Sequence, residues 1–210
     1  MFTETIANYR FGIAEPLELD EVRRFHHDMF LESGYIAKSS PTGMIEDSRI
    51  DVSIYFYCRD MNGEVIGVIR QINGSGLGLP TIDDFKLWPE QKVFINRILW
   101  PKIVEIGSLA VNRNHNKVAE GLYRQIWQQS KRAQHSYWIA SIDNRLLRSL
   151  RSRRGFLWVD VGDSKLYMGS DTTPVIADLR EQMINMRERA PRFFDYINNP
   201  VPPDYLYLSM

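Results

Sequence analysis

The residue best placed to do chemistry in this sequence is Glu105, a carboxylate inside an apolar run. Its neighbours Ile103, Val104 and Ile106, followed by residues 109–111, predict a buried strand because several of them are β-branched. Burying an unpaired charge is costly, and an apolar setting would raise the pKa of such a carboxylate towards that of a general base. The alternatives are a half-exposed position at a strand edge and a structural pair with an arginine.

A polar turn, residues 112–117, follows this strand directly, and helical spacing of apolar residues begins at Val118. A helix entered from a strand in this way points its first unpaired N–H groups and the positive end of its dipole at the turn, which suits phosphate oxygens. The same order of elements also occurs in most α/β domains, so it is compatible with a purely structural turn.

A second group of chemically notable residues is basic. Between Asn144 and Gly155 the chain has five arginines and no acid, on a segment whose leucines share one face of an expected helix. Such a run is either a solvated face or a docking patch that speeds the encounter with an acidic partner. The docking interpretation includes Lys131, Arg132, Arg145, Arg148, Arg151, Arg153 and Arg154.

Other chemistries find little support. The single cysteine, Cys58, excludes an intrachain disulfide and a CxxC metal site, and its alternating surroundings predict a packed thiol. His26 and His27 are adjacent, so on a helix they point about 100° apart and cannot chelate one metal. We interpret them as surface or packing histidines and predict no metal site. Residues 74–78 are rich in glycine but lack the spacing of a nucleotide loop, which favours a flexible turn.

Length and composition limit the classes of protein to which this chain can belong. The 210 residues carry 26 basic and 26 acidic side chains, so no overall field recruits nucleic acid or a membrane. The length predicts a single domain over 1–210, with two small domains as the alternative, and 190–210 is expected to be an irregular tail packed on the body. The start lacks the pattern of a signal peptide and no long apolar stretch occurs, so we expect a cytoplasmic protein without integral membrane association.

The elements that must position these residues alternate between strand and helix. A loop over 33–50 rich in Gly, Ser and Pro interrupts them, as either a functional segment or a solvated excursion. The expected strands are 9–14, 52–59, 65–72, 103–111 and 136–142, with a hairpin of 156–161 and 165–169. The expected helices are 17–31, 81–99 with a break at Pro89, 118–133, 144–154 and one ending near 189.

This order resembles the GNAT acyltransferase fold, an α/β fold with a mixed central sheet flanked by helices. Four motifs narrow the resemblance: ELDEVRRFHHDMFLESGYI, Asp51 before the first hairpin, GEVIGVIR ending in Arg70, and VEIGSLAV. Together they are similar to the acyl-homoserine lactone synthases, and closer still to the N-acyl amino acid synthases of the long-chain N-acyl-tyrosine type. The resemblance extends over most of residues 8 to 180.

The resemblance implies roles for individual residues. Glu105 would be the base, with backbone N–H groups near Leu109 and Val111 stabilising the oxyanion. Arg70 would either bind the carboxylate of an amino acid or brace the acidic loop. The substrate set is Phe30, Tyr35, Asp47, Asp51, Arg70 and Ser108, and the pantetheine set is Arg113, Asn114, His115, Asn116 and Lys117.

Two departures from the resembled pattern refine the expected function. Ser108 stands where lactone synthases have arginine, which argues against S-adenosylmethionine as acceptor, and the turn 113–117 has no glycine, which favours acyl carrier protein over coenzyme A.

We therefore expect transfer of a long-chain acyl group from acyl carrier protein to the α-amino group of an amino acid, tyrosine favoured, by direct aminolysis. No cofactor is expected to be permanently bound, because the acyl-phosphopantetheine of the carrier is a co-substrate, with acyl-CoA as the alternative. A coenzyme A-dependent N-acyltransferase of small amines and a non-catalytic module that binds acyl chains or carrier protein are the competing hypotheses.

Overall fold

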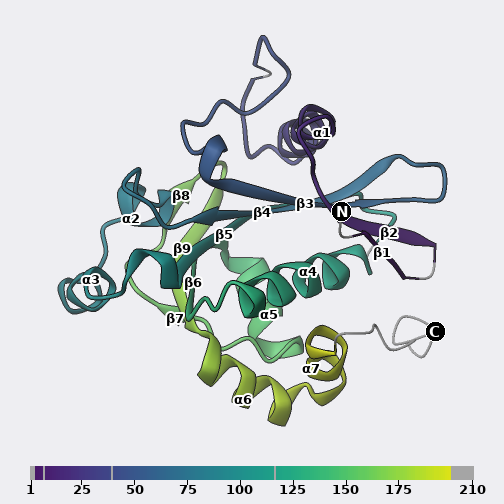
Figure 1. Ribbon diagram of the computed structural model, residues 1–210. Helices are drawn as coiled ribbons and strands as arrows, with labels where there is room; N and C mark the ends of the chain where they lie inside the picture. The colour runs from purple at the N-terminus through teal and green to yellow at the C-terminus, as the bar shows by residue number, and fades with distance from the viewer. Residues whose placement is uncertain (1–2, 7, 39, 116, 200–210) are drawn as a thin grey trace. The chain divides into compact units, whose positions relative to one another are not determined.

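The computed structural model describes residues 3–6, 8–38, 40–115 and 117–199 (Figure 1). The chain divides into two compact units that alternate along the sequence. Unit 1 is Met1–Gln71, Ser108–Gln129 and Tyr196–Met210, and unit 2 is Ile72–Gly107 and Ser130–Asp195. Strands β4 and β5 each begin in one unit and end in the other. The single domain expected for 1–210 stays a prediction.

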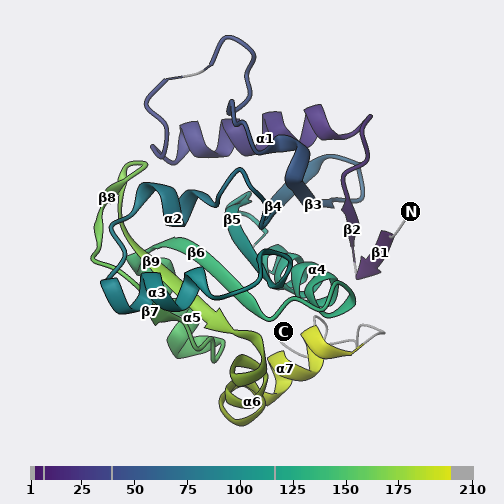
Figure 2. The same ribbon diagram turned by 60° about the vertical axis from the view of Figure 1, so that its left-hand side comes forward.

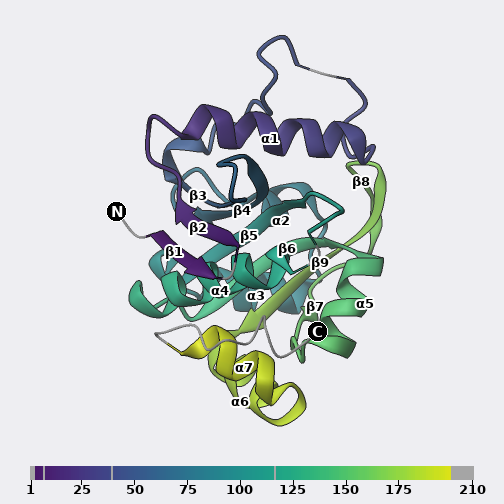
Figure 3. The same ribbon diagram turned by 90° about the vertical axis from the view of Figure 1, so that its right-hand side faces the viewer.

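Unit 1 contains an antiparallel sheet with helices on both of its faces. Its strand order is β1-β2-β3-β4, followed by the second half of β5. Helix α1 lies over one face and helix α4 along the other (Figure 1), and Figure 3 shows α1 crossing the strands. The elements are β1 (Thr3–Ile6), β2 (Tyr9–Ile13), α1 (Leu19–Glu32), η1 (Ile50–Val52), β3 (Ser53–Arg59), β4 (Val65–Asn73), β5 (Ile103–Val111) and α4 (Val118–Arg132).

Successive side chains of a strand point to opposite faces of the sheet, so one strand can pack against both α1 and α4. On β4, Gly67 lies so close to α4 that an added Cβ would come within 2.4 Å of Val118 Cγ1. The next residue, Val68, packs instead with Tyr55 and with Val22 of α1. Consecutive residues therefore serve opposite helices, which is why a nearly continuous apolar run suits this strand.

Unit 2 is built around β6, which pairs with β9 over its whole length. The antiparallel register runs from Tyr137↔Asp178 to Asp143↔Thr172, while β5 pairs with β6 in parallel at Ile103↔Tyr137. The elements are α2 (Pro80–Asp84), α3 (Pro89–Asn96), η2 (Trp100–Lys102), β6 (Tyr137–Asp143), α5 (Asn144–Arg153), β7 (Val159–Asp160), β8 (Lys165–Tyr167), β9 (Ser170–Asp178) and α6 (Leu179–Arg189).

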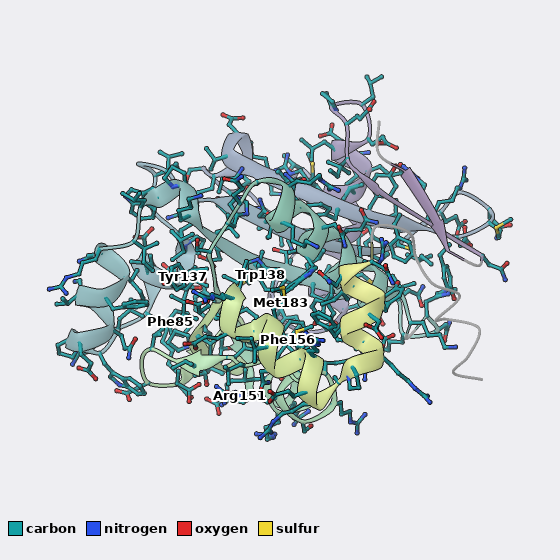
Figure 4. The ribbon with its side chains drawn as sticks, turned by 60° about the horizontal axis from the view of Figure 1, so that its bottom comes forward. Phe85, Tyr137, Trp138, Arg151, Phe156 and Met183 are labelled. Atoms are coloured by element: carbon teal, nitrogen blue, oxygen red, sulfur yellow. The ribbon has the colours of Figure 1, made fainter. Side chains whose placement is uncertain are left out.

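Aromatic side chains form the core of unit 2. Trp138 and Phe156 lie close together (Figure 4), with ring centroids 6.4 Å apart, and Trp158 stacks on Phe156 at 6.1 Å. The indole N–H of Trp138 donates to Ser130 Oγ at 2.8 Å, so its polar group is satisfied inside the core. These large rings supply much of the buried apolar area of the unit.

In unit 2, an aspartate lies at each of two junctions where a strand ends and a helix begins. The Asp143 carboxylate accepts hydrogen bonds from the backbone N–H groups of Arg145 and Leu146, and Asp178 does the same for Arg180 at the start of α6. Each cap satisfies backbone donors that the first turn leaves unpaired and places a negative charge at the positive end of the helix dipole. The chain therefore changes from strand to helix within one residue at both positions.

The structure confirms the mixed sheet flanked by helices, and it corrects several local predictions. Residues 156–161 and 165–169 do not form a hairpin with each other, because β7 and β8 each pair with β9. The tail is not irregular throughout, since Pro191–Asn198 forms helix α7, while 200–210 lie outside the described residues. Strands β1 and β9 were not predicted. None of the described helices has the length and apolar character needed to cross a membrane.

The contact between β2 and α4 gives a stability prediction. A Cβ added to Gly121 would lie 2.1 Å from Phe11 Cζ, and both residues are buried. Gly121→Ala should therefore lower the free energy of unfolding by about 1–3 kcal/mol through overpacking, although alanine favours a helix by about 1 kcal/mol.

Urea unfolding would measure this change, and Phe11→Leu combined with Gly121→Ala is the matched test. The smaller side chain should make the glycine substitution less harmful than it is alone. Equal or greater stability of Gly121→Ala would contradict this packing.

Candidate active site

Glu105 lies in the buried first half of β5, with 4% of its surface exposed. Its Oε1 accepts a hydrogen bond from the Thr81 hydroxyl and its Oε2 accepts one from the Thr81 backbone N–H, both at 2.9 Å. Thr81 is fully buried and follows Pro80 at the start of α2. The half-exposed edge position considered for Glu105 is therefore wrong, and the carboxylate is held by a charge-assisted pair of donors.

The strand changes character just after Glu105. The parallel register with β6 covers Ile103, Val104 and Glu105, and residues 107–109 are partly exposed where 103–106 are buried. Ser108 has φ of 55°, and a Cβ added to Gly107 would meet no atom within 4 Å. A non-glycine residue in the left-handed region costs free energy and is typical of functional sites. The backbone at 107–109 is therefore strained and open on one side.

Arg70 lies on β4 in unit 1 and is almost fully buried. Its Nη1 forms an ion pair with Asp47 Oδ2, and its Nε and Nη2 donate to Ser53 Oγ at 2.9 and 2.8 Å. The guanidinium also lies 5.4 Å from the ring centre of Tyr55. Two roles were considered for Arg70, and these contacts correspond to the one in which it braces the acidic loop.

Asp47 reaches this ion pair from the loop between α1 and η1, which Figure 2 shows rising past α1 before it returns to β3. Burial acts to raise the pKa of Asp47, but hydrogen bonds from Arg70 and from the Arg49 backbone N–H outweigh it and hold the pKa below its ordinary value of 3.8. Asp51, in contrast, is exposed in η1 and takes no part in the Arg70 contacts of the described chain.

Aromatic rings lie beside this ion pair. Phe30 contacts Tyr35 at 5.2 Å between ring centroids, and His26 meets Phe30 edge to face at 4.3 Å. His26 is 3% exposed, and burial together with the charge of Arg70 lowers its pKa to about 3, so the imidazole is neutral. Of the two interpretations of this histidine, packing is correct. The structure therefore brings Phe30, Tyr35 and Asp47 together around α1.

The turn before α4 is only partly available to a phosphate. His115 Nδ1 hydrogen-bonds to the Tyr9 hydroxyl at 3.1 Å, while Arg113 and Asn114 are exposed. Lys117 is partly exposed, and Asn116 lies outside the described residues. Pantetheine binding by this turn stays a prediction.

The arginines of the basic segment fall into two groups, those that contact other parts of the protein and those that are exposed. Arg151, labelled in Figure 4, donates to the Trp158 carbonyl at 2.7 Å and pairs with Asp160 at 2.5 Å. Arg154 lies 5.8 Å from the ring centre of Phe193. These two arginines have structural partners, so the exposed basic residues are Arg145, Arg148 and Arg153 on α5 and Lys131 and Arg132 at the end of α4.

Sequence reasoning missed Thr81, Ser53, Tyr55 and Tyr9. Ser53 and Tyr55 could have been predicted as neighbours of Arg70. They are alternate residues of β3, so they point to one face of the sheet, and Arg70 of β4 points to the same face. The signal for Thr81 was weaker. Pro80 comes just before it, and proline is common in the first turn of a helix. Within the described part of the chain, no three His, Cys, Asp or Glu side chains are grouped as a metal site.

No protein-family profile and no curated protein sequence matches this chain. Solved structures do match it. FeeM, an N-acyl amino acid synthase from uncultured soil microbes, has a TM-score of 0.63 at 18% identity, covering 85% of this chain and 96% of its own. The acyl-homoserine lactone synthase LasI has a TM-score of 0.67 at 14% identity, covering 86% and 94%. This chain has the fold of these synthases.

Two further solved structures share this fold. The CoA-dependent lactone synthase BjaI, with SAM and isopentyl-CoA, has a TM-score of 0.66 at 18% identity, covering 90% of each chain. A ribosomal-protein-S5-alanine acetyltransferase from Vibrio fischeri has a TM-score of 0.53 at 11% identity, covering 87% and 99%. The expected resemblance to this synthase fold is therefore confirmed.

The Arg70 ion pair gives a pH prediction. Because the folded state lowers the pKa of Asp47, the unfolded state binds more protons as the pH falls, and stability falls with it. Asp47→Asn should cost about 1–3 kcal/mol at neutral pH. This difference from the native protein should remain full above pH 3.8 and disappear as the pH falls through the lowered pKa.

Urea unfolding at several pH values would check this prediction. Asp51→Asn is the matched control, since Asp51 is exposed, and it should leave stability nearly unchanged. A difference for Asp47→Asn that stays constant down to pH 2 would show that the ion pair is absent in solution.

The Thr81 hydroxyl gives a second prediction for this site. Thr81→Val removes one donor to a buried carboxylate, which should lower the free energy of unfolding by about 1.5–3 kcal/mol. Thr81→Ser keeps the hydroxyl and should retain most of the lost stability. If valine and serine were equally stable in thermal and urea unfolding, the hydroxyl would not be bonded to Glu105.

Proposed function

We propose that this protein is an N-acyltransferase that moves a long-chain acyl group from acyl carrier protein to the α-amino group of an amino acid, with tyrosine favoured. The observation that carries the proposal is Glu105, a buried carboxylate on β5 that is followed within a few residues by strained, partly exposed backbone at 107–109. A buried base close to accessible backbone donors suits an acyl transfer that proceeds through an oxyanion.

The reaction is direct aminolysis of a thioester. The amino acid arrives as an ammonium ion, and Glu105 accepts a proton from it directly or through a water. The free amine attacks the thioester carbonyl, and backbone N–H groups near Leu109 and Val111 stabilise the tetrahedral oxyanion. The carbon–sulfur bond then breaks, the nitrogen gives up its second proton as the amide forms, and the departing pantetheine thiolate takes up a proton. No covalent enzyme intermediate is required.

Three features support the finer choices in this proposal. Ser108 offers no cation where the resembled lactone synthases have arginine, which favours a simple amino acid over S-adenosylmethionine. The fold is shared with an N-acyl amino acid synthase, FeeM. The exposed arginines Arg145, Arg148 and Arg153 suit an acidic carrier protein.

Acyl selection would depend on apolar contact. A chain of about a dozen carbons, at ~0.8 kcal/mol per buried methylene, offers on the order of 10 kcal/mol before the costs of binding. Exposed arginine pairs contribute only ~0.2–1 kcal/mol each. The arginines would therefore assist the encounter with the carrier, and the acyl chain would supply the affinity.

A second candidate is a coenzyme A-dependent transferase. It is favoured by the shared fold of BjaI, which is CoA-dependent, and of the S5-alanine acetyltransferase. A binding module without catalysis is the third candidate, because the two Thr81 donors give Glu105 a structural role as well.

The test uses purified protein with acyl carrier protein or coenzyme A carrying the same long acyl chain, and a mixture of amino acids as acceptors. Mass spectrometry should detect N-acyl amino acids, with the carrier thioester used at the higher kcat/KM. Higher kcat/KM with coenzyme A would support the second candidate, and binding of acyl carrier without product would support the third.

Glu105→Gln tests the base. Loss of a general base should lower kcat by about 10²–10⁴-fold. The exposed Glu90→Gln is the matched control and should retain activity. Because the glutamine amide would meet a Thr81 donor, circular dichroism and the thermal midpoint must confirm folding. Near-normal kcat in a folded Glu105→Gln protein would remove Glu105 from the chemistry.

A further inference from the structure

Helix α1 has two polar atoms that are buried and have no hydrogen-bond partner among the described residues, Arg23 Nε and His26 Nε2. The two residues are three positions apart, so they are neighbours on one side of the helix. A buried donor left unsatisfied costs free energy, and such a group in a folded protein calls for an explanation, of which a bound water or ion is one.

Both side chains are fixed by their surroundings. Arg23 Nη2 donates to the Ile45 carbonyl at 3.1 Å, which ties the guanidinium to the loop that carries Asp47. The His26 ring lies between Phe30 at 4.3 Å and Tyr55 at 6.2 Å, measured between ring centroids. The two unsatisfied atoms are therefore held in place before any ligand arrives, which limits the entropy that binding would cost.

Arg70 and Arg23 differ in their partners. Asp47 compensates Arg70 through their ion pair, whereas the side chain of Arg23 bonds to the Ile45 carbonyl and to Tyr55 and has no carboxylate partner among the described residues. His26 is neutral, with a pKa of about 3 that reflects burial first and then the nearby arginines. A bound anion would give Arg23 a charged partner.

We propose that Arg23 and His26 bind the α-carboxylate of the amino acid acceptor. The carboxylate would accept hydrogen bonds from Arg23 Nε and from His26 Nε2, with the neutral imidazole in the tautomer that carries its proton on Nε2. Arg70 then remains the brace of the loop and is not the carboxylate receptor. This inference rests on the proposed function and specifies how the acceptor class is recognised.

Access and neighbours fit a small zwitterion. Arg23 is partly exposed, and the side chain of Asp47 is 16% exposed, so the group of residues reaches the surface on one side. Phe30 and Tyr55 lie beside the His26 ring, and rings of this kind suit an apolar or aromatic side chain. An amine without a carboxylate would leave the Arg23 charge uncompensated and would be rejected.

The experiment compares L-tyrosine with tyramine, which lacks only the carboxylate, as acceptors for one acyl carrier thioester. The native protein should prefer tyrosine, and Arg23→Gln should lower the tyrosine-to-tyramine ratio of kcat/KM by about 10–100-fold. His26→Gln keeps a side-chain donor and should preserve much of the preference, whereas His26→Phe should lose it. Arg24→Gln, an exposed neighbour on α1, is the control and should keep the native ratio.

An equilibrium measurement separates this inference from the proposed function. Thermal shift and calorimetry should detect L-tyrosine, or one of the other standard amino acids tested singly, binding to the native protein but not to Arg23→Gln. Such binding supports the inference even if no acyl transfer occurs. Equal use of tyrosine and tyramine, equal loss of both in Arg23→Gln, or no binding of any amino acid would overturn the inference. The first two results would leave the acyltransferase proposal intact.

Discussion

A carboxylate inside a sheet must be given hydrogen-bond donors, and Glu105 receives two of them from one residue, Thr81. This constraint fixes the start of α2 against β5, since the backbone N–H of Thr81 is itself one of the donors. A side-chain contact alone could shift with a rotamer, whereas a backbone donor moves only with the helix. The rest of the candidate chemistry depends on this anchor, because Glu105 keeps its position on β5 beside the strained residues 107–109.

Unit 1 uses the same principle with the opposite charge. Arg70 is buried on β4 and receives its acceptors from Asp47 and Ser53, so a cation in the sheet draws the acidic loop onto the face that α1 covers. Glu105 and Arg70 thus each take a partner from a segment outside the regular sheet. In both cases the polar partner decides where an otherwise irregular stretch of chain must lie.

Much of the fold could be predicted from the sequence because it depends on local pattern. The strand 103–111 and the helix from Val118 were predicted from the apolar run and the helical spacing, and bracing of the acidic loop was one of the two roles expected for Arg70. The pairing of β7 and β8 with β9 was not found, since short strands choose partners by distant register. Thr81 was also missed, because the polar partner of a buried group can come from a segment far away in the sequence, here 24 residues from Glu105.

The left-handed conformation of Ser108 has a consequence for how the protein tolerates heat. Glycine adopts this conformation without steric penalty, while serine sacrifices roughly 1–2 kcal/mol of folding stability there. Glycine at residue 108 would remove this steric cost, and its greater freedom in the unfolded chain would offset part of the gain in stability. The conformation of residue 108 is therefore imposed by the surrounding chain and not by the preference of serine.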